Sequence, residues 1–563
     1  MIMKLRNIIY SALAVSALAL TSCSDSYLDE KMFSSYGTDV EDVNAKVIGL
    51  HYKFADLWGW SDQQGFTGCW QDGTDVGAPG DTQGVEVPFY QYGSLNSENS
   101  GVNKLWTSLY SIINSANIII NTEGVDAAAK GEAEFFRAYS YNLLVTLWGK
   151  VPLLTESKAE PRTDFTRDEI SAIDAVITAD LNDAIANLPE VGKTATQNRI
   201  NKDCARILAG EAFCRMGKYS EAEAAVSATI NSGNYQLISE RYGKFLADAG
   251  DYYSDMFRWG NQRRSQGNTE GIWVFQMEYN RDVTGGTINA PQQRRNWVAG
   301  FHKLTDFMVN ADSLGGRGNG RLRLSNYVKY GIYQEGDIRN SNHNIRRILY
   351  ANKAGVNKEV WIKEINGFPY RVDEGTEGAT KVTVKTGDRC YWTTADTLNT
   401  MYPHTTKWGG YDTTDDFGWS LIKDWPLMRL ADAYLLRAEA RIQQNNTAGA
   451  AEDINVLRDR AFKTYREETG NAEAGKVTAA QMTMDFLLDE RIRELVGEEN
   501  RRYTLCRTGK LAERVKMIMD NWAEGTESKK ITGFNASTHC LLPIPLSEIQ
   551  LNKDADLQQN PGY

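Results

Sequence analysis

Apolar residues recur at helical spacing in several long blocks of the chain. In residues 102–122, the side chains of Leu105, Leu109, Ile112 and Ile119 fall on one face of a helix, which predicts an amphipathic helix there. The same spacing predicts helices over residues 132–148, 168–188, 201–216, 219–231, 427–443, 447–461 and 479–507. These blocks indicate a mainly α fold.

Two of the predicted helix pairs are similar in sequence. Leu208–Ala212 aligns with Leu436–Ala440, and the same offset of 228 positions aligns Ala222 with Ala450 without a gap. The run Gly217–Ala222 resembles the turn and second-helix start of a tetratricopeptide repeat. Small residues at these positions allow two helices to pack closely. The sequence therefore predicts tetratricopeptide-like helix pairs in the scaffold.

Two long segments have no helical period. Residues 62–101 contain eight glycines, and residues 260–424 contain only short strand-like runs such as 272–277 and 381–385. Long irregular segments in a compact domain are usually functional or disordered. These segments carry too many aromatic residues for simple disordered linkers. We therefore expect a single domain over residues 23–563, in which irregular loops and minor β structure form a binding face on a helical scaffold.

The first residues have the pattern of a lipoprotein signal peptide. Lys4 and Arg6 make a basic start, a short apolar run follows, and Leu20-Thr21-Ser22 directly precedes Cys23. The apolar run is too short to span a bilayer as a mature helix. The pattern predicts that residues 1–22 are removed and that Cys23 is lipidated. The alternative is an ordinary secretory signal with a cysteine there by chance.

Charge and composition narrow the classes of partner. The net charge of −11 argues against nucleic acid, whose phosphates need a basic face. The 14 Trp and 27 Tyr residues suit sugar binding as well as packing, because their rings are flat and amphipathic. The seven cysteines contain no Cys-x-x-Cys pair, and we expect no metal, cofactor or disulfide framework. We interpret Asp412, Asp415 and Asp416 as a solvated acidic turn and not as a calcium site.

Catalytic motifs in the chain are incomplete. The run Gly470–Val477 resembles a phosphate-binding loop but lacks the Ser or Thr that holds magnesium. A glycosidase needs only two carboxylates at a set separation, and 73 acidic residues leave such a pair open. We expect a binding protein and no enzyme. A helical glycoside-active enzyme is the alternative.

Aromatic and polar residues in the two long loops are the candidates for ligand contact. Sugars present C–H faces to aromatic rings, and they present hydroxyl groups to amide, carboxylate and guanidinium side chains. The candidates are Trp70, Asp72, Tyr92, Arg295, Trp297 and Trp408. The alternative for each ring is that it packs its loop against the scaffold. Trp106 and Trp148 lie on predicted helices and are expected in the core, and Trp425 is expected to be structural.

Motifs at both ends of the chain resemble the SusD/RagB family of outer-membrane nutrient-binding lipoproteins. The matching stretches are Tyr27–Asp29 after the lipid cysteine, Trp106 to Asn117, Phe136–Tyr139 with Gly149–Leu153, Tyr434–Ala440, Glu490 to Arg501, and Leu542 to Tyr563. Two positions depart from the pattern, because Glu499 stands where the family often has Gly and Thr504 where it often has Asp. Both departures lie on a predicted scaffold helix. They therefore cast doubt on contacts along that helix and not on the resemblance to the family.

The resemblance implies a fold, a ligand class and a partner. Such proteins have a helical fold in which tetratricopeptide-like pairs support a loop-built binding face. They bind oligosaccharides or polysaccharides at the cell surface and act as lids on a SusC-like TonB-dependent transporter of the outer membrane. A minority bind other nutrients, including peptides. We therefore expect a lipid-anchored outer-membrane protein that faces the exterior.

Replacing Cys23 by Ala tests the lipid anchor. We expect the Cys23→Ala variant to move from the membrane fraction to the soluble fraction, because acyl chains contribute about 0.8 kcal/mol per buried methylene group to membrane binding. Fractionation followed by immunoblotting measures the distribution. A variant that remains with the membrane would rule out the lipoprotein assignment.

Overall fold

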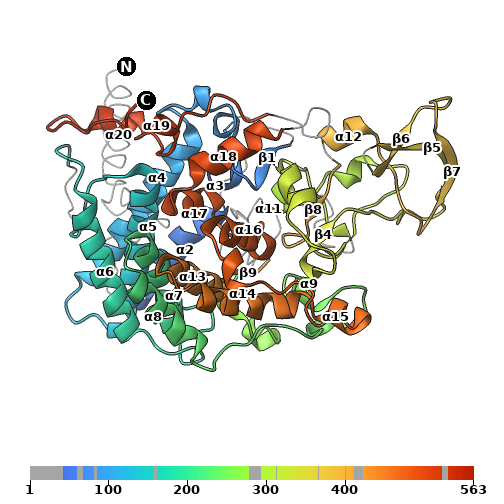
Figure 1. The fold of residues 1–563 in the computed structure, drawn as a ribbon. Helices are drawn as coiled ribbons and strands as arrows, with labels where there is room; N and C mark the ends of the chain where they lie inside the picture. The colour runs from blue at the N-terminus through green and yellow to red at the C-terminus, as the bar shows by residue number, and fades with distance from the viewer. Residues whose placement is uncertain are drawn as a thin grey trace, which may run out of the picture.

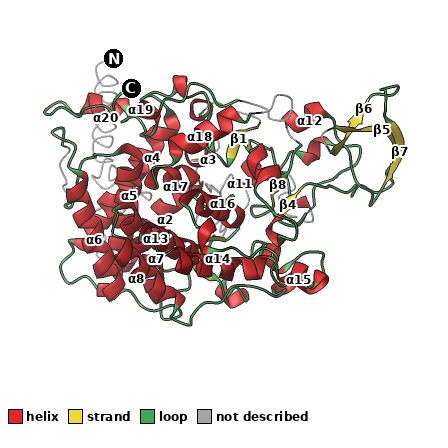
Figure 2. Ribbon diagram, in the orientation of Figure 1, coloured by secondary structure: helices red, strands yellow, loops and turns green. Residues whose placement is uncertain are grey.

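A block of helices and a set of inserted loops make up the structure, a computed structural model that describes residues 42–59, 67–80, 85–157, 162–277, 293–311, 314–365, 367–399, 401–410, 423–522 and 530–563. The helices gather at the left and centre of Figure 1, and the short strands lie mainly at the right (Figures 1 and 2). Cys23 and the acidic run Asp412, Asp415 and Asp416 lie outside the described residues. Within the described ranges, no helix combines the length and apolar character needed to cross a bilayer.

The first described helices are α2 (Val43–Gly59), α3 (Thr67–Gln71), α4 (Ser100–Ile120), α5 (Ala127–Trp148) and α6 (Ile170–Asn187). The last three lie where the apolar periodicity predicts helices, whereas α2 and α3 were not predicted. The side chain of Asn99 caps α4 by accepting a hydrogen bond from the backbone N–H of Val102 at 3.0 Å. Helix α5 ends at Gly149, whose φ of 74° favours glycine. Trp106 and Trp148 are buried, which confirms their predicted place in the core.

The two tetratricopeptide-like pairs are α7 (Lys202–Arg215) with α8 (Tyr219–Ile230), and α13 (Leu430–Gln443) with α14 (Thr447–Ala461). Each helix of the second pair begins 228 positions after its counterpart, which confirms the repeat predicted from the sequence. Helix α8 packs directly against α13, so the two pairs are adjacent although the long insertion separates them in the chain. A Cβ on Gly210 would collide with Val226, which explains the glycine at this helix crossing.

The predicted helix over residues 479–507 is wrong as a single element. The chain forms η11 (Ala479–Gln481), α16 (Met484–Leu495) and α17 (Arg501–Arg507), with a turn between the last two. Gly497 has φ of 80° in this turn, and Asn500 caps α17 by accepting from the N–H of Tyr503 at 3.1 Å. The remaining C-terminal helices are α15 (Lys463–Thr469), α18 (Leu511–Asp520), α19 (Ala536–His539) and α20 (Leu546–Leu551).

The inserted loops contain short antiparallel strands. Two-stranded pairs form between β1 (Gly77–Pro79) and β3 (Leu322–Leu324), β2 (Gly271–Phe275) and β9 (Trp425–Arg429), and β4 (Ile345–Arg346) and β8 (His404–Thr405). A three-stranded sheet has β5 (Asn357–Ile365) between β6 (Phe368–Val372) and β7 (Thr380–Lys385). The short helices among these strands are η3 (Val87–Phe89), η4 (Tyr92–Ser94), η5 (Gly243–Phe245), α9 (Tyr252–Asp255), η6 (Arg264–Gln266), α11 (Gln293–Trp297), η7 (Phe301–Lys303), η9 (Tyr327–Gly331), η10 (Ile338–Asn340) and α12 (Thr394–Asn399).

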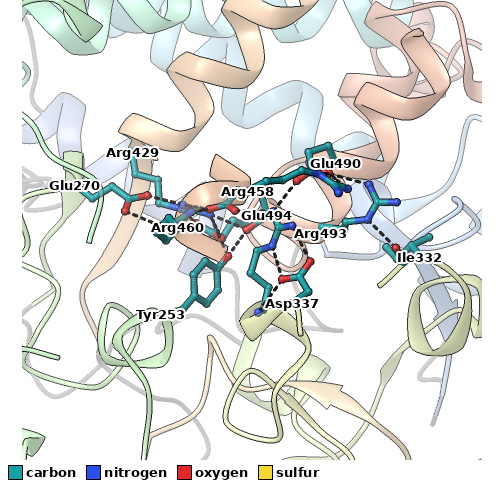
Figure 3. Close-up of polar contacts among 12 residues, drawn as sticks. Tyr253, Glu270, Ile332, Asp337, Arg429, Arg458, Arg460, Glu490, Arg493 and Glu494 are labelled. Atoms are coloured by element: carbon teal, nitrogen blue, oxygen red, sulfur yellow. Dashed lines mark hydrogen bonds and ion pairs between the residues drawn. The ribbon is translucent and has the colours of Figure 1, made fainter. Parts of the chain in front are cut away.

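A network of buried charges joins α16 to the inserted segments (Figure 3). Glu490 and Glu494 on α16 are fully buried. Arg339 donates to both carboxylates, at 2.9 and 3.0 Å. Arg429, at the end of β9, donates to the carboxylates of Glu494 at 2.6 Å and Glu270 at 2.7 Å. The buried ion network comprises these residues together with Asp337, Lys407, Arg458, Arg460, Arg493 and Glu498.

The network keeps its carboxylates ionised. Burial by itself would raise the pKa of Glu494, but Arg460, Arg429 and Arg339 outweigh burial and hold this pKa well below its usual range. The pKa of Glu490 is lowered in the same way, because burial is outweighed by neighbouring arginines. An isolated charge at such a depth would be very costly. Glu490 and Glu494 therefore depend on partners that come from distant parts of the chain.

Replacing Glu494 by Gln tests this dependence. We expect a loss of about 3–5 kcal/mol in the free energy of unfolding at pH 7, because buried arginines lose their counter-charge. The folded-state pKa of Glu494 is depressed, so its stabilising contribution is present above the unfolded-state value of about 4.3 and declines as the pH falls below it. The difference in unfolding free energy between the variant and the unchanged protein should therefore be smaller at acidic pH than at pH 7.

Urea titrations at pH 7 and pH 3 measure both effects. Glu467→Gln, which removes an exposed carboxylate on α15, is the control and should change the unfolding free energy by less than about 0.5 kcal/mol. Equal effects of the two substitutions would contradict the role given to the network.

Candidate functional site

A pocket of about 620 Å³ opens among the inserted loops. Its walls come from residues 248–259 around α9, residues 342–352 around β4, and residues 406–409 after β8, with Leu314 and Gly315 closing one side. The side chains of Phe257, Leu314 and Leu349 are buried and give the pocket an apolar base. Two other pockets in the described part of the chain, one lined by Tyr139 and Arg491 and one lined by Val76 and Val496, are much smaller. A volume of this size suits a small-molecule or glycan ligand.

Hydrogen bonds fix the walls of the pocket to one another. Asp251 accepts from the hydroxyl of Ser341 at 2.7 Å and from the amide of Asn344 at 3.0 Å. The hydroxyl of Thr406 donates to the carbonyl of His343 at 2.6 Å, and the N–H of Gly410 donates to the carbonyl of Gly315 at 3.0 Å. The pocket is therefore a preformed cavity, because four separate segments are tied together around it.

Two aromatic side chains and several polar groups face the pocket. Trp259 is partly exposed, and Tyr350 is 51% exposed. Arg258 donates to the carboxylate of Asp248 at 3.0 Å across the rim. Asn342 is already occupied, because its side-chain oxygen accepts from two backbone N–H groups of its own loop at 2.8 Å. The pocket thus offers two rings for stacking and a polar rim for hydroxyl groups.

The pocket wall formed by residues 406–409, after β8, is hydrogen-bonded to the C-terminal end of α16. Lys407 donates to the carbonyl of Glu494 at 2.7 Å and pairs with the carboxylate of Glu498. The indole N–H of Trp408 donates to the carbonyl of Gly497 at 2.7 Å. Lys423 donates to the carbonyls of Lys407 and Gly409, both at 2.7 Å. The buried ion network therefore reaches the pocket wall through Lys407.

Burial also changes the acid–base behaviour of this wall. Burial lowers the pKa of Lys407 to about 8, although the carboxylate of Glu498 acts in the opposite direction. Burial and the neighbouring Arg346 lower the pKa of His404 to about 3, so its ring is neutral at pH 7. His343 is exposed at the pocket. Of the two histidines described near the pocket, His404 is thus buried and neutral, and His343 is exposed.

The candidates from the first loop lie in the interior, away from the pocket. Trp70, Asp72 and Tyr92 are 4%, 2% and 0% exposed. Arg502 of α17 donates to the carbonyl of Asp72 at 2.7 Å and to the hydroxyl of Tyr92 at 3.0 Å. The hydroxyl of Tyr92 in turn donates to the carbonyl of Gly73 at 2.8 Å. In this structure the side chain of Tyr92 and the backbone of Asp72 hold the first loop on the scaffold, and ligand contact by Trp70, Asp72 or Tyr92 stays a prediction.

The candidates from the second loop are also buried. Arg295 and Trp297 lie on α11 and are 7% and 1% exposed, and Trp408 is 3% exposed. The ring of Trp408 stacks on Trp425, which is itself buried as predicted. The guanidinium of Arg294 donates to the carbonyl of Gly410 at 3.2 Å and so connects α11 with the loop of Trp408. Ligand contact by Arg295, Trp297 or Trp408 stays a prediction. Their burial argues against such contact in this structure.

Sequence reasoning missed the two rings that do face the pocket. Trp259 comes directly before the long loop that begins near residue 260, and Tyr350 comes within it. Tyr350 shares the pocket lining with Asn342 and His343, and Trp259 follows Arg258. An aromatic residue next to polar residues in the sequence could have indicated these two rings, but many other positions in the loop have the same pattern.

Comparison with known proteins places the chain in a family. A family profile described as "SusD family" matches residues 262–563, and one described as "Starch-binding associating with outer membrane" matches residues 27–209. SusD-like protein P25 of Formosa agariphila is 27% identical over 597 residues and covers 100% of both chains. Starch-binding protein SusD of Bacteroides thetaiotaomicron is 37% identical over 140 residues, which are 25% of this chain and 22% of that one.

Solved structures share the fold. Surface glycan-binding protein A from Bacteroides fluxus superposes with a TM-score of 0.64 at 19% identity, covering 92% of this chain and 99% of that one. A laminarin binding SusD-like protein superposes with a TM-score of 0.63 at 20% identity, with 92% and 99% of the two chains covered. The family profile covers more than half of the chain, and the helical architecture agrees with it. This protein therefore belongs to the SusD family.

Proposed function

We propose that this protein captures a glycan, an oligosaccharide or polysaccharide, in the pocket between α9 and β4 and passes it to a SusC-like TonB-dependent transporter. It does so from the outer membrane, to which a lipid on Cys23 anchors it, facing the exterior. The observation that carries the proposal is the preformed pocket with Trp259 and Tyr350 in its wall, in a chain of the SusD family. Names of relatives that refer to starch, laminarin and surface glycan support the ligand class.

The chemistry of the pocket supports a ligand that presents both C–H faces and hydroxyl groups. A sugar ring can stack its C–H face on Trp259 or Tyr350, while its hydroxyl groups reach the polar rim. Stacking of a flat ring on an aromatic side chain is worth on the order of 1–3 kcal/mol by analogy with nucleic-acid bases. Two such contacts provide much of the affinity that a ligand without strong charge requires.

The pocket favours binding over hydrolysis. A glycosidase needs two carboxyl groups on either side of the scissile bond. Among the described residues that line the pocket, Asp248 is the one carboxylate, and it is paired with Arg258. A helical glycoside-active enzyme is therefore the weaker proposal. Steady release of reducing ends, proportional to protein and absent from a mock purification, would favour it.

Removing either pocket ring tests the proposal. We expect Trp259→Ala and Tyr350→Ala each to weaken glycan binding roughly tenfold, because each removes one stacking contact. The melting temperature should change little, because both rings are partly exposed and contribute little to the core. Affinity electrophoresis against soluble starch, laminarin, arabinoxylan and pectin, followed by calorimetric titration, measures the binding.

A panel that includes a casein hydrolysate separates the glycan proposal from a peptide-binding alternative. The control is Tyr52→Ala, which removes a ring that is 69% exposed on α2 and should bind as the unchanged protein does. If no glycan of the panel binds while the peptides do, the ligand class proposed here is wrong.

The buried rings should behave differently from the pocket rings. We expect Trp297→Ala to lower the free energy of unfolding by about 3–5 kcal/mol, because it removes a large buried side chain. Urea denaturation compared with glycan titration distinguishes the two roles. A Trp297→Ala variant that melts normally and fails to bind would instead support the ligand contact predicted from the sequence.

A further inference from the structure

Three aromatic residues lie on one face of the three-stranded sheet. In the antiparallel register, Trp361 is opposite Val372, Lys363 is opposite Tyr370, and Ile365 is opposite Phe368. Residues that face each other across strands, and residues two apart along a strand, point to the same side. Trp361, Tyr370 and Phe368 therefore share a face, and each is half-buried. The rings of Phe368 and Tyr370 are 5.1 Å apart between centroids.

This face continues from the rim of the pocket. Arg389 lies between the two, because its guanidinium carbon is 5.3 Å from the ring centroid of Phe368 and its backbone pairs with that of Tyr350. Tyr350 is the exposed ring of the pocket wall. The N–H of Cys390 donates to the carbonyl of Leu349 at 2.8 Å, which ties the exit of β7 to the same wall. The rings thus form a track from Tyr350 past Arg389 to Phe368, Tyr370 and Trp361, in which Phe368 and Tyr370 also pack on one side against the apolar cluster around Trp392.

The dimensions and chemistry of the track fit an extended chain. Val372, the position opposite Trp361, lies four positions after Phe368 on β6, which corresponds to about 14 Å along the strand. Charged and hydroxyl side chains accompany the rings on this face, including Lys363, Thr383 and the ion pair of Lys381 with Glu359 at 2.6 Å. A continuous apolar surface would suit a protein partner. Rings that alternate with polar groups suit a polymer of sugars, whose units present C–H faces and hydroxyl groups in turn.

We infer that the sheet face from Phe368 to Trp361 is a second glycan-contact surface, continuous with the pocket, and that it binds the continuation of a polysaccharide chain whose other part occupies the pocket. The inference rests on the proposed function and extends it. It makes the protein a binder of long chains: a polymer reaches both surfaces, and a short fragment reaches only the pocket. The sheet extends away from the helical block, at the far right of Figure 1, where a long chain can approach it.

A comparison of chain lengths tests the inference. The first probe is whichever polysaccharide among starch, laminarin, arabinoxylan and pectin retards the unchanged protein most. The second probe is the trisaccharide prepared from that polysaccharide. We expect Trp361→Ala to weaken binding of the polymer roughly tenfold and to leave binding of the trisaccharide unchanged. Trp259→Ala should weaken both. Tyr52→Ala, on the distant α2, is the control for loss of an exposed ring and should weaken neither.

Hydroxyl-radical footprinting of the unchanged protein makes the test independent of the folding of any variant. We expect the polymer, and not the trisaccharide, to slow oxidation of Trp361 and Tyr370. Normal polymer binding by Trp361→Ala, or unprotected rings, would overturn the second surface while the pocket effect of Trp259→Ala still supports the proposed function. Failure of every polysaccharide to retard the unchanged protein would overturn the proposed function and this inference together.

Discussion

Two fully buried glutamates on α16 impose the constraint on which the arrangement of this protein depends. Glu490 and Glu494 remain ionised in the interior, so the fold must bring cations to them. The cations come from three parts of the chain: Arg339 in the insertion, Arg429 at the end of β9, and Arg458 and Arg460 on α14. A buried ion pair is a poor source of net stability, but it strongly disfavours arrangements that leave one partner unpaired. The network therefore selects the position of the insertion relative to the helices.

The same network explains why the pocket has a defined shape although loops form it. Loops usually contribute less stability than packed helices and open more readily. Here Lys407 extends the network into the pocket wall, and Trp408 adds a hydrogen bond to Gly497 in the turn after α16. That turn is the point at which the long helix expected from the sequence breaks. The break exposes the carbonyl that accepts from Trp408, so a local departure from helical geometry becomes an attachment point for the binding face.

The division of aromatic residues follows from these attachments. A tryptophan that fastens a loop to the scaffold must be buried, because its ring packs and its N–H needs an acceptor. Trp408 meets both conditions against Trp425 and Gly497. Trp259 and Tyr350 lie in loop walls that backbone and polar side-chain bonds already fix, so their rings remain available at the surface. The sheet beyond Tyr350 repeats this arrangement, since its backbone ladder fixes Trp361 without enclosing it.

The sequence by itself determined the long helices α4 to α8, α13 and α14, the repeated pair, the short strands β2 and β7, and the burial of Trp106 and Trp148. These features depend on local spacing, since apolar residues at helical intervals define a buried face whatever it packs against. Tertiary structure alone decided which loop aromatics face solvent. Trp297 and Trp259 have similar neighbours in the sequence, since one follows an asparagine and the other an arginine, yet one is 1% exposed and the other lines the pocket. The difference arises from the distant segments that pack on each ring, and the residues adjacent in the sequence do not indicate which segments those are.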